Sequence, residues 1–138
     1  MNKGLYNKIL IATDGSDVAK KAVSYGIRFA RLFGAQIYVV YVIANRFGSG
    51  RAVTEYLTQE GEEALKSARE AGEKADAELE TELLEGIPGD EIVSFAEKNN
   101  IDLIVMGSLG KTGLSKFLLG SVAENVIRHA RTQVLVVR

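Results

Sequence analysis

The sequence lacks several groups on which catalysis and metal binding commonly depend. None of its 138 residues is cysteine, so disulfides, thiolate metal sites and thiol nucleophiles are excluded. The single histidine, His129, falls in the last turn of the last predicted helix, where it favours the negative end of the helix dipole, and we assign it no catalytic role. Paired carboxylates, a nucleophile beside a base and the G-x-S-x-G sequence of serine hydrolases are also absent. The sequence therefore predicts binding, with at most slow hydrolysis of a bound ligand.

Long apolar segments are absent as well. The first six residues lack the apolar core of a signal peptide, and no apolar run approaches the ~20 residues that span a bilayer. We therefore expect a soluble cytoplasmic protein that does not associate with membranes. The formal net charge of -1 argues against general binding of nucleic acids or other polyanions.

The residues that are present suit one compact domain. With 46% hydrophobic content, we expect a single domain over residues 1–138, without a linker or an internal repeat. Charge is unevenly distributed, because residues 55–91 hold 13 of the 18 acidic residues and only 3 of the 17 basic ones. We interpret this region as a solvated acidic helix face. The basic flanks favour a phosphate ligand only weakly.

Strand and helix patterns alternate along the whole chain. Short apolar runs without alternation predict buried parallel strands over residues 8–13, 36–43, 81–85, 102–106 and 133–137. Helical spacing predicts helices from the turn at 14–17 to Gly34, over a stripe from Leu57 to Leu79, from a cap at Asp90 to Asn99, and over 121–130. Residues 44–53 are expected to form a mobile loop. This alternation predicts an α/β fold, a doubly wound five-stranded parallel sheet with helices on both faces.

A glycine-rich stretch follows the fourth predicted strand. Gly107 ends the strand, Gly110-Lys111-Thr112 follows, and Gly120-Ser121 precedes the last helix. Glycines let a ligand approach the backbone, and the free N–H groups at a helix start favour anions. The stretch is not a Walker A loop, because Val105 stands where its first glycine should be, and the dinucleotide G-x-G-x-x-G is missing.

Two groups beside this stretch have both structural and ligand-binding interpretations. Ser121 precedes Glu124 by three residues, which predicts a capping box; the N–H groups of Ser121 and Val122 would at the same time suit a phosphate. Asp14 follows the first strand, where it is either a turn residue bonded to its own backbone or a carboxylate for ribose hydroxyls or a base N–H.

The spacing of Gly107, Gly110 and Gly120-Ser121 resembles the nucleotide-binding signature of the universal stress protein family, in its ATP-binding branch. Further segments also look like the family: residues 11–16, 41–43, 86–92, 102–107 and 133–137. Ala12 stands where many ATP-binding members have proline, which removes no side-chain contact. The resemblance covers the chain apart from the loop and helix after Asn45.

The resemblance implies a strand order of 3-2-1-4-5, which brings Asp14 and Gly107 to one crevice where the strand order reverses. It places adenine and ribose near Ala12, Thr13, Asp14, Val42, Met106 and Gly107. It places the triphosphate on Gly110, Gly120, Ser121 and Val122. It further implies Mg²⁺ bridging the phosphates, with no metal site built from protein side chains alone.

The resemblance and the end of the chain together imply a homodimer. The last predicted strand is apolar at Val134, Leu135, Val136 and Val137, and a bare apolar edge strand favours pairing. In the family this strand pairs with its copy across a two-fold axis.

The leading hypothesis is a regulatory module that binds ATP or another adenine nucleotide. A slow ATPase or phosphotransferase and a nucleotide-free dimeric scaffold remain as alternatives, and a flavin-binding protein is a more distant one. The intact glycines speak against the scaffold.

Overall fold

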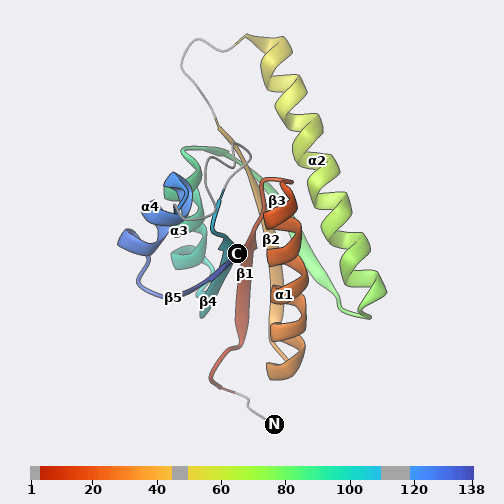
Figure 1. Cartoon of the computed structure of the whole chain (residues 1–138), viewed down its shortest axis with the longest axis vertical. Coiled ribbons are helices and arrows are strands. Elements are labelled where there is room, and N and C mark those ends of the chain that lie inside the picture. The colour runs from red at the N-terminus through yellow and green to blue at the C-terminus, as the bar shows by residue number, and fades with distance from the viewer. Residues whose placement is uncertain (1–3, 45–49, 110–118) are drawn as a thin grey trace.

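The computed structural model describes residues 4–44, 50–109 and 119–138, in which strands and helices alternate (Figure 1). The elements in chain order are β1 (Lys8–Ala12), α1 (Asp17–Phe33), β2 (Gln36–Ala44), α2 (Arg51–Lys74), β3 (Leu79–Gly86), α3 (Pro88–Lys98), β4 (Leu103–Gly107), α4 (Ser121–His129) and β5 (Gln133–Val137). All strand pairs are parallel and their order is β3-β2-β1-β4-β5. The predicted five-stranded doubly wound fold and its strand order are confirmed.

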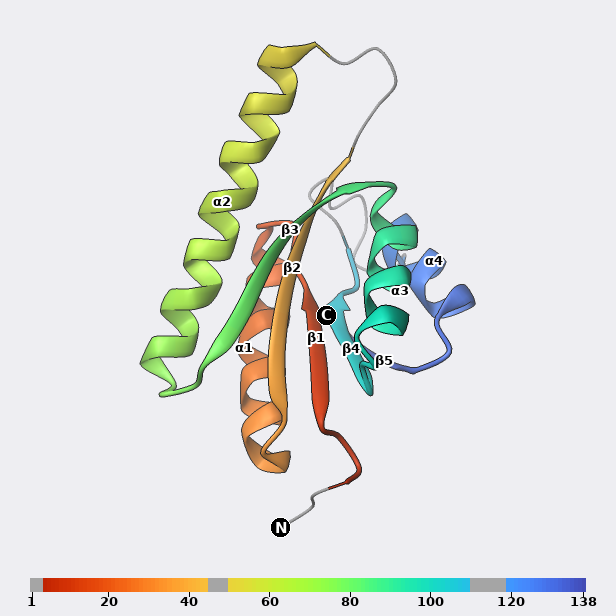
Figure 2. The ribbon, with the colours of Figure 1, turned by 180° about the vertical axis from the view of Figure 1, so that it is seen from behind.

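The sheet is covered on both faces, which explains why its central strands are apolar without alternation. α1 and α2 lie on one face and α3 and α4 on the other (Figures 1 and 2). In β1, Ile9 and Ile11 pack into the core under α1 and α2, whereas Leu10 packs into the core under α3 and α4. All three side chains are fully buried, so each of these positions favours an aliphatic residue.

The central strand β1 is tied to β4 at the amino-terminal end of both strands. The Asp102 carboxylate accepts the backbone N–H groups of Asn7 at 2.7 Å and Lys8 at 2.9 Å, and the Asp102 N–H donates to the Lys8 carbonyl at 2.8 Å. Farther along, Ile11 pairs with Val105. These contacts fix the register in which the two strands reach their carboxyl ends.

α1 begins and ends as its sequence predicts. The Ser16 hydroxyl accepts the Ala19 N–H at 3.2 Å, and Gly34 closes the helix in the left-handed region at φ 66°. Gly26 lies directly on β1, since a Cβ there would be 2.5 Å from Ile11 Cδ1. This close packing holds the middle of α1 against β1.

α2 begins and ends earlier than expected. It begins at Arg51 and β2 continues to Ala44, so the predicted loop at 44–53 begins one residue too early and ends three residues too late; residues 45–49 lie outside the described part. Leu79, expected on the helix stripe, is the first residue of β3, because the chain turns after Lys74 through Asp76 at φ 54°. The buried stripe of Gly61, Leu65, Ala68 and Gly72 is confirmed, and the glutamates of the opposite face are largely exposed.

α3 does not begin at Asp90. Its N-cap is Ile87 and Pro88 occupies the first helical position, where proline has no N–H to lose and its fixed φ suits the helix. Asp90 therefore lies inside the first turn. Its carboxylate instead accepts a hydrogen bond from Asn125 of α4.

Candidate functional site

The carboxyl ends of β1 and β4 lie side by side where the strand order reverses. β1 leads into α1 on one face and β4 leads towards α4 on the other, so a crevice opens between the two connections. A cavity of about 300 Å³ occupies this place. Its lining comprises Ala12, Thr13, Asp14, Ala19, Val40, Tyr41, Val42, Ala44, Leu57, Pro88, Ile92, Met106, Gly107, Ser108, Leu109, Gly120, Ser121, Val122 and Ala123.

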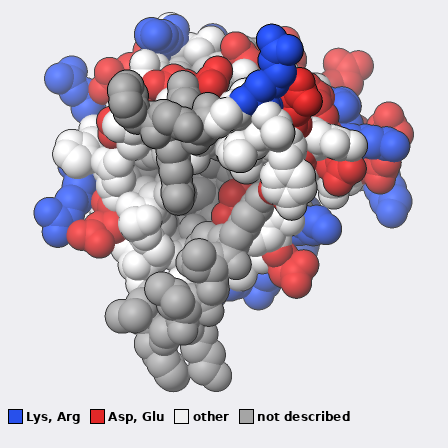
Figure 3. Space-filling model, turned by 90° about the horizontal axis from the view of Figure 1, so that it is seen from above, with Lys and Arg blue, Asp and Glu red and all other residues white. Residues whose placement is uncertain are grey.

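Asp14 is the one charged residue among the lining residues that the structure describes. Figure 3 looks onto this end of the molecule and shows uncharged side chains beside a central hollow, with Lys, Arg, Asp and Glu lying mainly around the periphery. A ligand entering the cavity therefore meets an apolar interior with a few polar groups, the usual composition of a small-molecule site.

The turn after β1 is held by its own side chains. Thr13, only 8% exposed, donates its N–H to Val40 O at 3.0 Å and accepts the Gly15 N–H on Oγ1 at 3.1 Å. Asp14 Oδ1 accepts the Ser16 N–H at 2.9 Å, and Gly15 supplies a φ of 81°. Asp14 is thus a turn residue that also lines the cavity. Both interpretations of this carboxylate fit the structure.

The glycine-rich stretch is anchored to β5 and to α1. Ser108 donates its N–H to Val137 O at 2.8 Å, and Gly120 donates its N–H to Ser108 O at 2.7 Å. Gly107 lies against α1, since a Cβ there would be 2.8 Å from Val18 Cγ1. The predicted cradle residues Gly107, Gly120 and Ser121 are therefore adjacent, whereas Gly110 lies outside the described residues.

α4 does not carry the predicted capping box. Its N-cap is Gly120 at φ −66° and ψ 156°, without a side-chain capping bond, and Ser121 is already the first helical residue. Glu124 instead pairs with Arg128 at 2.9 Å on the exposed side of the helix. The first bond within the helix runs from Glu124 N to Gly120 O.

The missing capping side chain leaves the start of α4 suited to an anion. The N–H groups of the first three helical residues, Ser121, Val122 and Ala123, precede the first bond within the helix and have no partner inside it. All three residues line the cavity. An anion there meets backbone donors and the positive end of the helix dipole.

The structure adds lining residues that the sequence did not single out. Pro88 and Ile92 of α3 and Leu57 of α2 complete the apolar part of the cavity, and Ser108 borders the glycines. Because β3 ends at the same edge of the sheet as β1 and β4, the turn from β3 into α3 could have been predicted to line the cavity. The helical stripe placed Leu57 on the inner face of its helix but did not indicate that this residue reaches the cavity.

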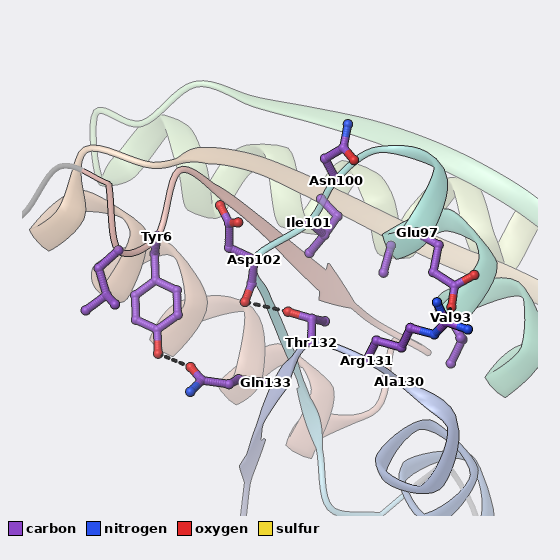
Figure 4. A pocket seen from close by; sticks show the side chains of 12 residues that line it. Tyr6, Val93, Glu97, Asn100, Ile101, Asp102, Ala130, Arg131, Thr132 and Gln133 are labelled. Carbon is purple, nitrogen blue, oxygen red and sulfur yellow. Dashed lines mark hydrogen bonds and ion pairs between the residues drawn. The ribbon is translucent and has the colours of Figure 1, made fainter.

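A larger cavity of about 650 Å³ lies at the opposite end of the sheet (Figure 4). Most of its polar side chains bond to one another or to nearby backbone: Tyr6 donates to Gln133, Thr132 donates to the Asp102 carbonyl, and Arg131 lies 3.9 Å from Glu97. It borders the end of α3, away from the helix starts and the glycine-rich stretch. It therefore offers a ligand fewer free groups than the cavity at the carboxyl ends.

Neither a protein metal cage nor a membrane span is found in the described part of the chain. No group of three or more His, Asp or Glu residues is placed to hold a metal ion among residues 4–44, 50–109 and 119–138. Over the same ranges, the helices are too short or too polar to cross a bilayer.

A model of the universal stress protein family matches residues 5–138. The chain belongs to the universal stress protein family. Universal stress protein MJ0531 of Methanocaldococcus jannaschii is 48% identical, and the match covers 99% of this chain and 84% of that relative. Among solved structures, universal stress protein UspA from Lactobacillus plantarum superposes with a TM-score of 0.85 at 30% identity, covering 96% of this chain and 98% of that one.

Two further structures of universal stress proteins contain nucleotides. One is a complex with cAMP, at 29% identity and a TM-score of 0.79, covering 98% of this chain and 99% of that one. The other is the Archaeoglobus fulgidus protein in complex with dAMP, at 27% identity and a TM-score of 0.69, covering 97% of this chain and 99% of that one. Nucleotide binding is thus known among the structural neighbours of this universal stress protein.

Proposed function

We propose that this universal stress protein binds an adenine nucleotide, ATP in particular, at the cavity between the ends of β1 and β4, and that occupancy serves stress regulation. The observation that carries the proposal is that one cavity contains an apolar interior, one carboxylate and a helix start bordered by glycines. The cAMP and dAMP complexes of related proteins support it, because both ligands carry adenine.

The parts of the cavity suit the parts of a nucleotide. Ala12, Val42 and Met106 offer apolar contacts to a purine ring, and Pro88 and Ile92 oppose them from α3. The adenine and ribose would therefore lie near the residues that the resemblance implies: Ala12, Thr13, Asp14, Val42, Met106 and Gly107. The Asp14 carboxylate has one oxygen engaged by the turn, so the other retains capacity for a ribose hydroxyl.

The phosphates would lie at the start of α4. Gly120 brings no side chain between the ligand and the backbone, while Ser121 and Val122 present N–H groups and Ser121 a hydroxyl. Gly110 is assigned to the same group by its spacing. Mg²⁺ would be held mainly by phosphate oxygens and water, which fits a site with a single carboxylate, and it would supply neutralising charge.

Binding is favoured over turnover by the chemistry of the lining. Among the described lining residues, Asp14 is the only charged one, its Oδ1 already accepts the Ser16 N–H, and no histidine or second carboxylate is present to activate water. Acid denaturation of freshly purified protein, followed by anion-exchange analysis of released small molecules, tests this. We expect bound ATP. ADP or AMP would favour the slow ATPase, and an empty protein that fails to bind Mg-ATP would favour the scaffold.

Gly120→Val tests the site itself. The backbone of Gly120 has an extended conformation that valine adopts freely, so the variant should fold and its side chain should block the phosphates. We expect ATP affinity by calorimetry to fall at least about tenfold, a loss of about 1.4 kcal/mol. Gly50→Val is the matched control: Gly50 also caps a helix in an extended conformation, but a Cβ there meets nothing within 4 Å. Equal ATP affinity in the two variants would contradict the assignment.

We also propose that two copies pair through β5. β5 is an edge strand whose Val134, Leu135 and Val136 are only half-buried in one protomer, and pairing with a second copy would cover them.

A further inference from the structure

The first turns of α3 and α4 both line the cavity. Pro88 and Ile92 line it from α3, and Ser121, Val122 and Ala123 line it from α4. The separation of these turns sets the distance between the apolar part of the cavity and the N–H groups of α4. Whatever fixes this separation therefore affects how a ligand with both an apolar ring and an anionic group fits.

One side-chain contact outside the cavity fixes the separation of these two turns. Asn125 Nδ2 donates to Asp90 Oδ1 at 3.2 Å, and among the described residues this is the only side-chain hydrogen bond between α3 and α4. Neither residue lines the cavity. Asn125 lies one helical turn after Ser121, and Asp90 lies between Pro88 and Ile92, so the bond joins the lining turns themselves.

Gly89 makes this contact possible. Gly89 is buried, and a Cβ there would lie 2.3 Å from Asn125 Nδ2, 2.7 Å from its Cγ and 2.8 Å from its Cβ. Any side chain at Gly89 would therefore push the two helices apart. Since Gly89 lies within the helix and has no left-handed φ, its role is to allow this approach.

The remaining contacts of Asn125 and its neighbours do not duplicate the bond. The Asn125 carbonyl contacts His129 Nδ1 at 2.9 Å within α4, and Glu124 pairs with Arg128 in the same helix. Ala123 and Val126 pack into the core under the sheet, which holds the inner side of α4. The Asn125 bond adds the lateral restraint towards α3.

We propose that Asn125 is a positioning residue for the nucleotide: bonded to Asp90 and seated on Gly89, it holds the first turn of α4 where its N–H groups meet the phosphates. This inference rests on the proposed function of the same cavity. Because Ala12, Val42 and Met106 belong to or adjoin the sheet, loss of the bond leaves the adenine contacts in place and misplaces the phosphate contacts.

Calorimetric titrations of nucleotide-stripped protein with Mg-ATP and with adenosine test the proposal. We expect Asn125→Ala to weaken Mg-ATP binding about fivefold to tenfold, the worth of one hydrogen bond, while adenosine affinity stays within about twofold. A general loss of stability would lower both affinities together, so the ratio between the ligands identifies positioning.

Asp90 variants complete the experiment. Asp90→Ala, at an exposed position that tolerates change, should weaken Mg-ATP as Asn125→Ala does, and the double variant should lose no more than either single variant because both remove one bond. Asp90→Asn keeps the Oδ1 acceptor and should retain the Mg-ATP affinity of the parent, which separates the bond from the charge of Asp90.

These measurements distinguish a failure of the proposed function from a failure of the inference about Asn125. If the parent protein binds neither ligand, the proposed function fails and the inference with it. If the parent binds Mg-ATP and Asn125→Ala binds it equally well, only the inference fails. Equal losses for adenosine and Mg-ATP, or additive losses in the double variant, would also overturn it.

Discussion

At the scale of single residues, Asp14 combines a structural bond with a position in the cavity. Its Oδ1 accepts the Ser16 N–H, which shapes the turn from β1 into α1, and its side chain is the charged part of the cavity lining. A turn residue and a ligand contact need not exclude each other, because a carboxylate has two oxygens and about four acceptor sites.

Substitution at Asp14 separates the two roles. Asp14→Asn keeps an oxygen for the turn, so stability should stay close to that of the parent, whereas Asp14→Ala should cost about 1 kcal/mol. Asp14→Ala should weaken adenosine and Mg-ATP alike, because the ribose is common to both. Urea denaturation and calorimetry measure the two effects. Unchanged adenosine affinity in Asp14→Ala would refute the ribose contact.

Substitution of Gly89 tests whether the close approach of α3 and α4 affects ligand binding. Gly89→Ala should destabilise the fold by about 1 to 3 kcal/mol through overpacking against Asn125 and should weaken Mg-ATP binding about tenfold. Gly72→Ala is a matched control, since a Cβ there lies 2.8 Å from Leu79 Cδ2 and 2.9 Å from Ala77 O, far along α2. It should be destabilised without a change in affinity. Equal affinities in both variants would mean that the close approach at Gly89 does not concern the ligand.

At the scale of the elements, the helices begin in different ways. α1 begins with the side-chain cap of Ser16, whereas α3 begins at Ile87 with Pro88, and α4 at Gly120 with no side-chain cap. α3 and α4, whose first turns line the cavity, therefore lack a capping side chain, as does α2 after Gly50. Backbone donors at such starts remain available to a ligand.

These helix starts predict that two substitutions lower the free energy of unfolding by different amounts. Ser16→Ala should lower the free energy of unfolding by about 1 kcal/mol, because the Ala19 N–H loses its partner. Glu124→Ala should cost less than about 0.5 kcal/mol, because its pair with Arg128 is largely exposed. The denaturant midpoints of the two variants measure both losses of stability. A loss of about 1 kcal/mol in Glu124→Ala would instead indicate a capping box in solution.

The element scale also shows what the sequence could predict. The five strands and their parallel order follow from buried apolar runs and from the resemblance, and β5 has the predicted bounds. The sequence could predict four residues of the cavity lining because they end or follow strands where the strand order reverses: Ala12, Thr13, Asp14 and Gly107. The caps at Ile87 and Gly120 were missed because neither residue has a capping side chain, although Pro88 at the first helical position was a local signal for the start of α3.

At the scale of the whole molecule, the two edges of the sheet differ. The edge strand β3 exposes Glu80, Glu82 and Glu85, whose like charges disfavour pairing of two such edges. The edge strand β5 carries half-buried aliphatic residues and no acid. Association of two copies is therefore favoured at β5.

Light scattering during gel filtration tests this association. The parent should have about twice the 15.0 kDa chain mass. Val136→Lys should shift it to one chain mass, because a lysine on an edge strand opposes pairing. Val136 is absent from both core clusters, so circular dichroism of this variant should match the parent. A parent of one chain mass at micromolar concentration would contradict the dimer.

The bonds between Asn7, Lys8 and Asp102 have a consequence for synthesis of the chain. β1, the centre of the sheet, leaves the ribosome before the other strands, yet the Asp102 carboxylate that receives the Asn7 N–H follows 95 positions later. At a translation rate of about 5–20 residues per second, β1 waits roughly 5 to 20 s for its neighbour β4. During this interval one side of the central strand is open. The nascent chain is therefore most exposed to aggregation and to chaperone capture just before its last strands emerge.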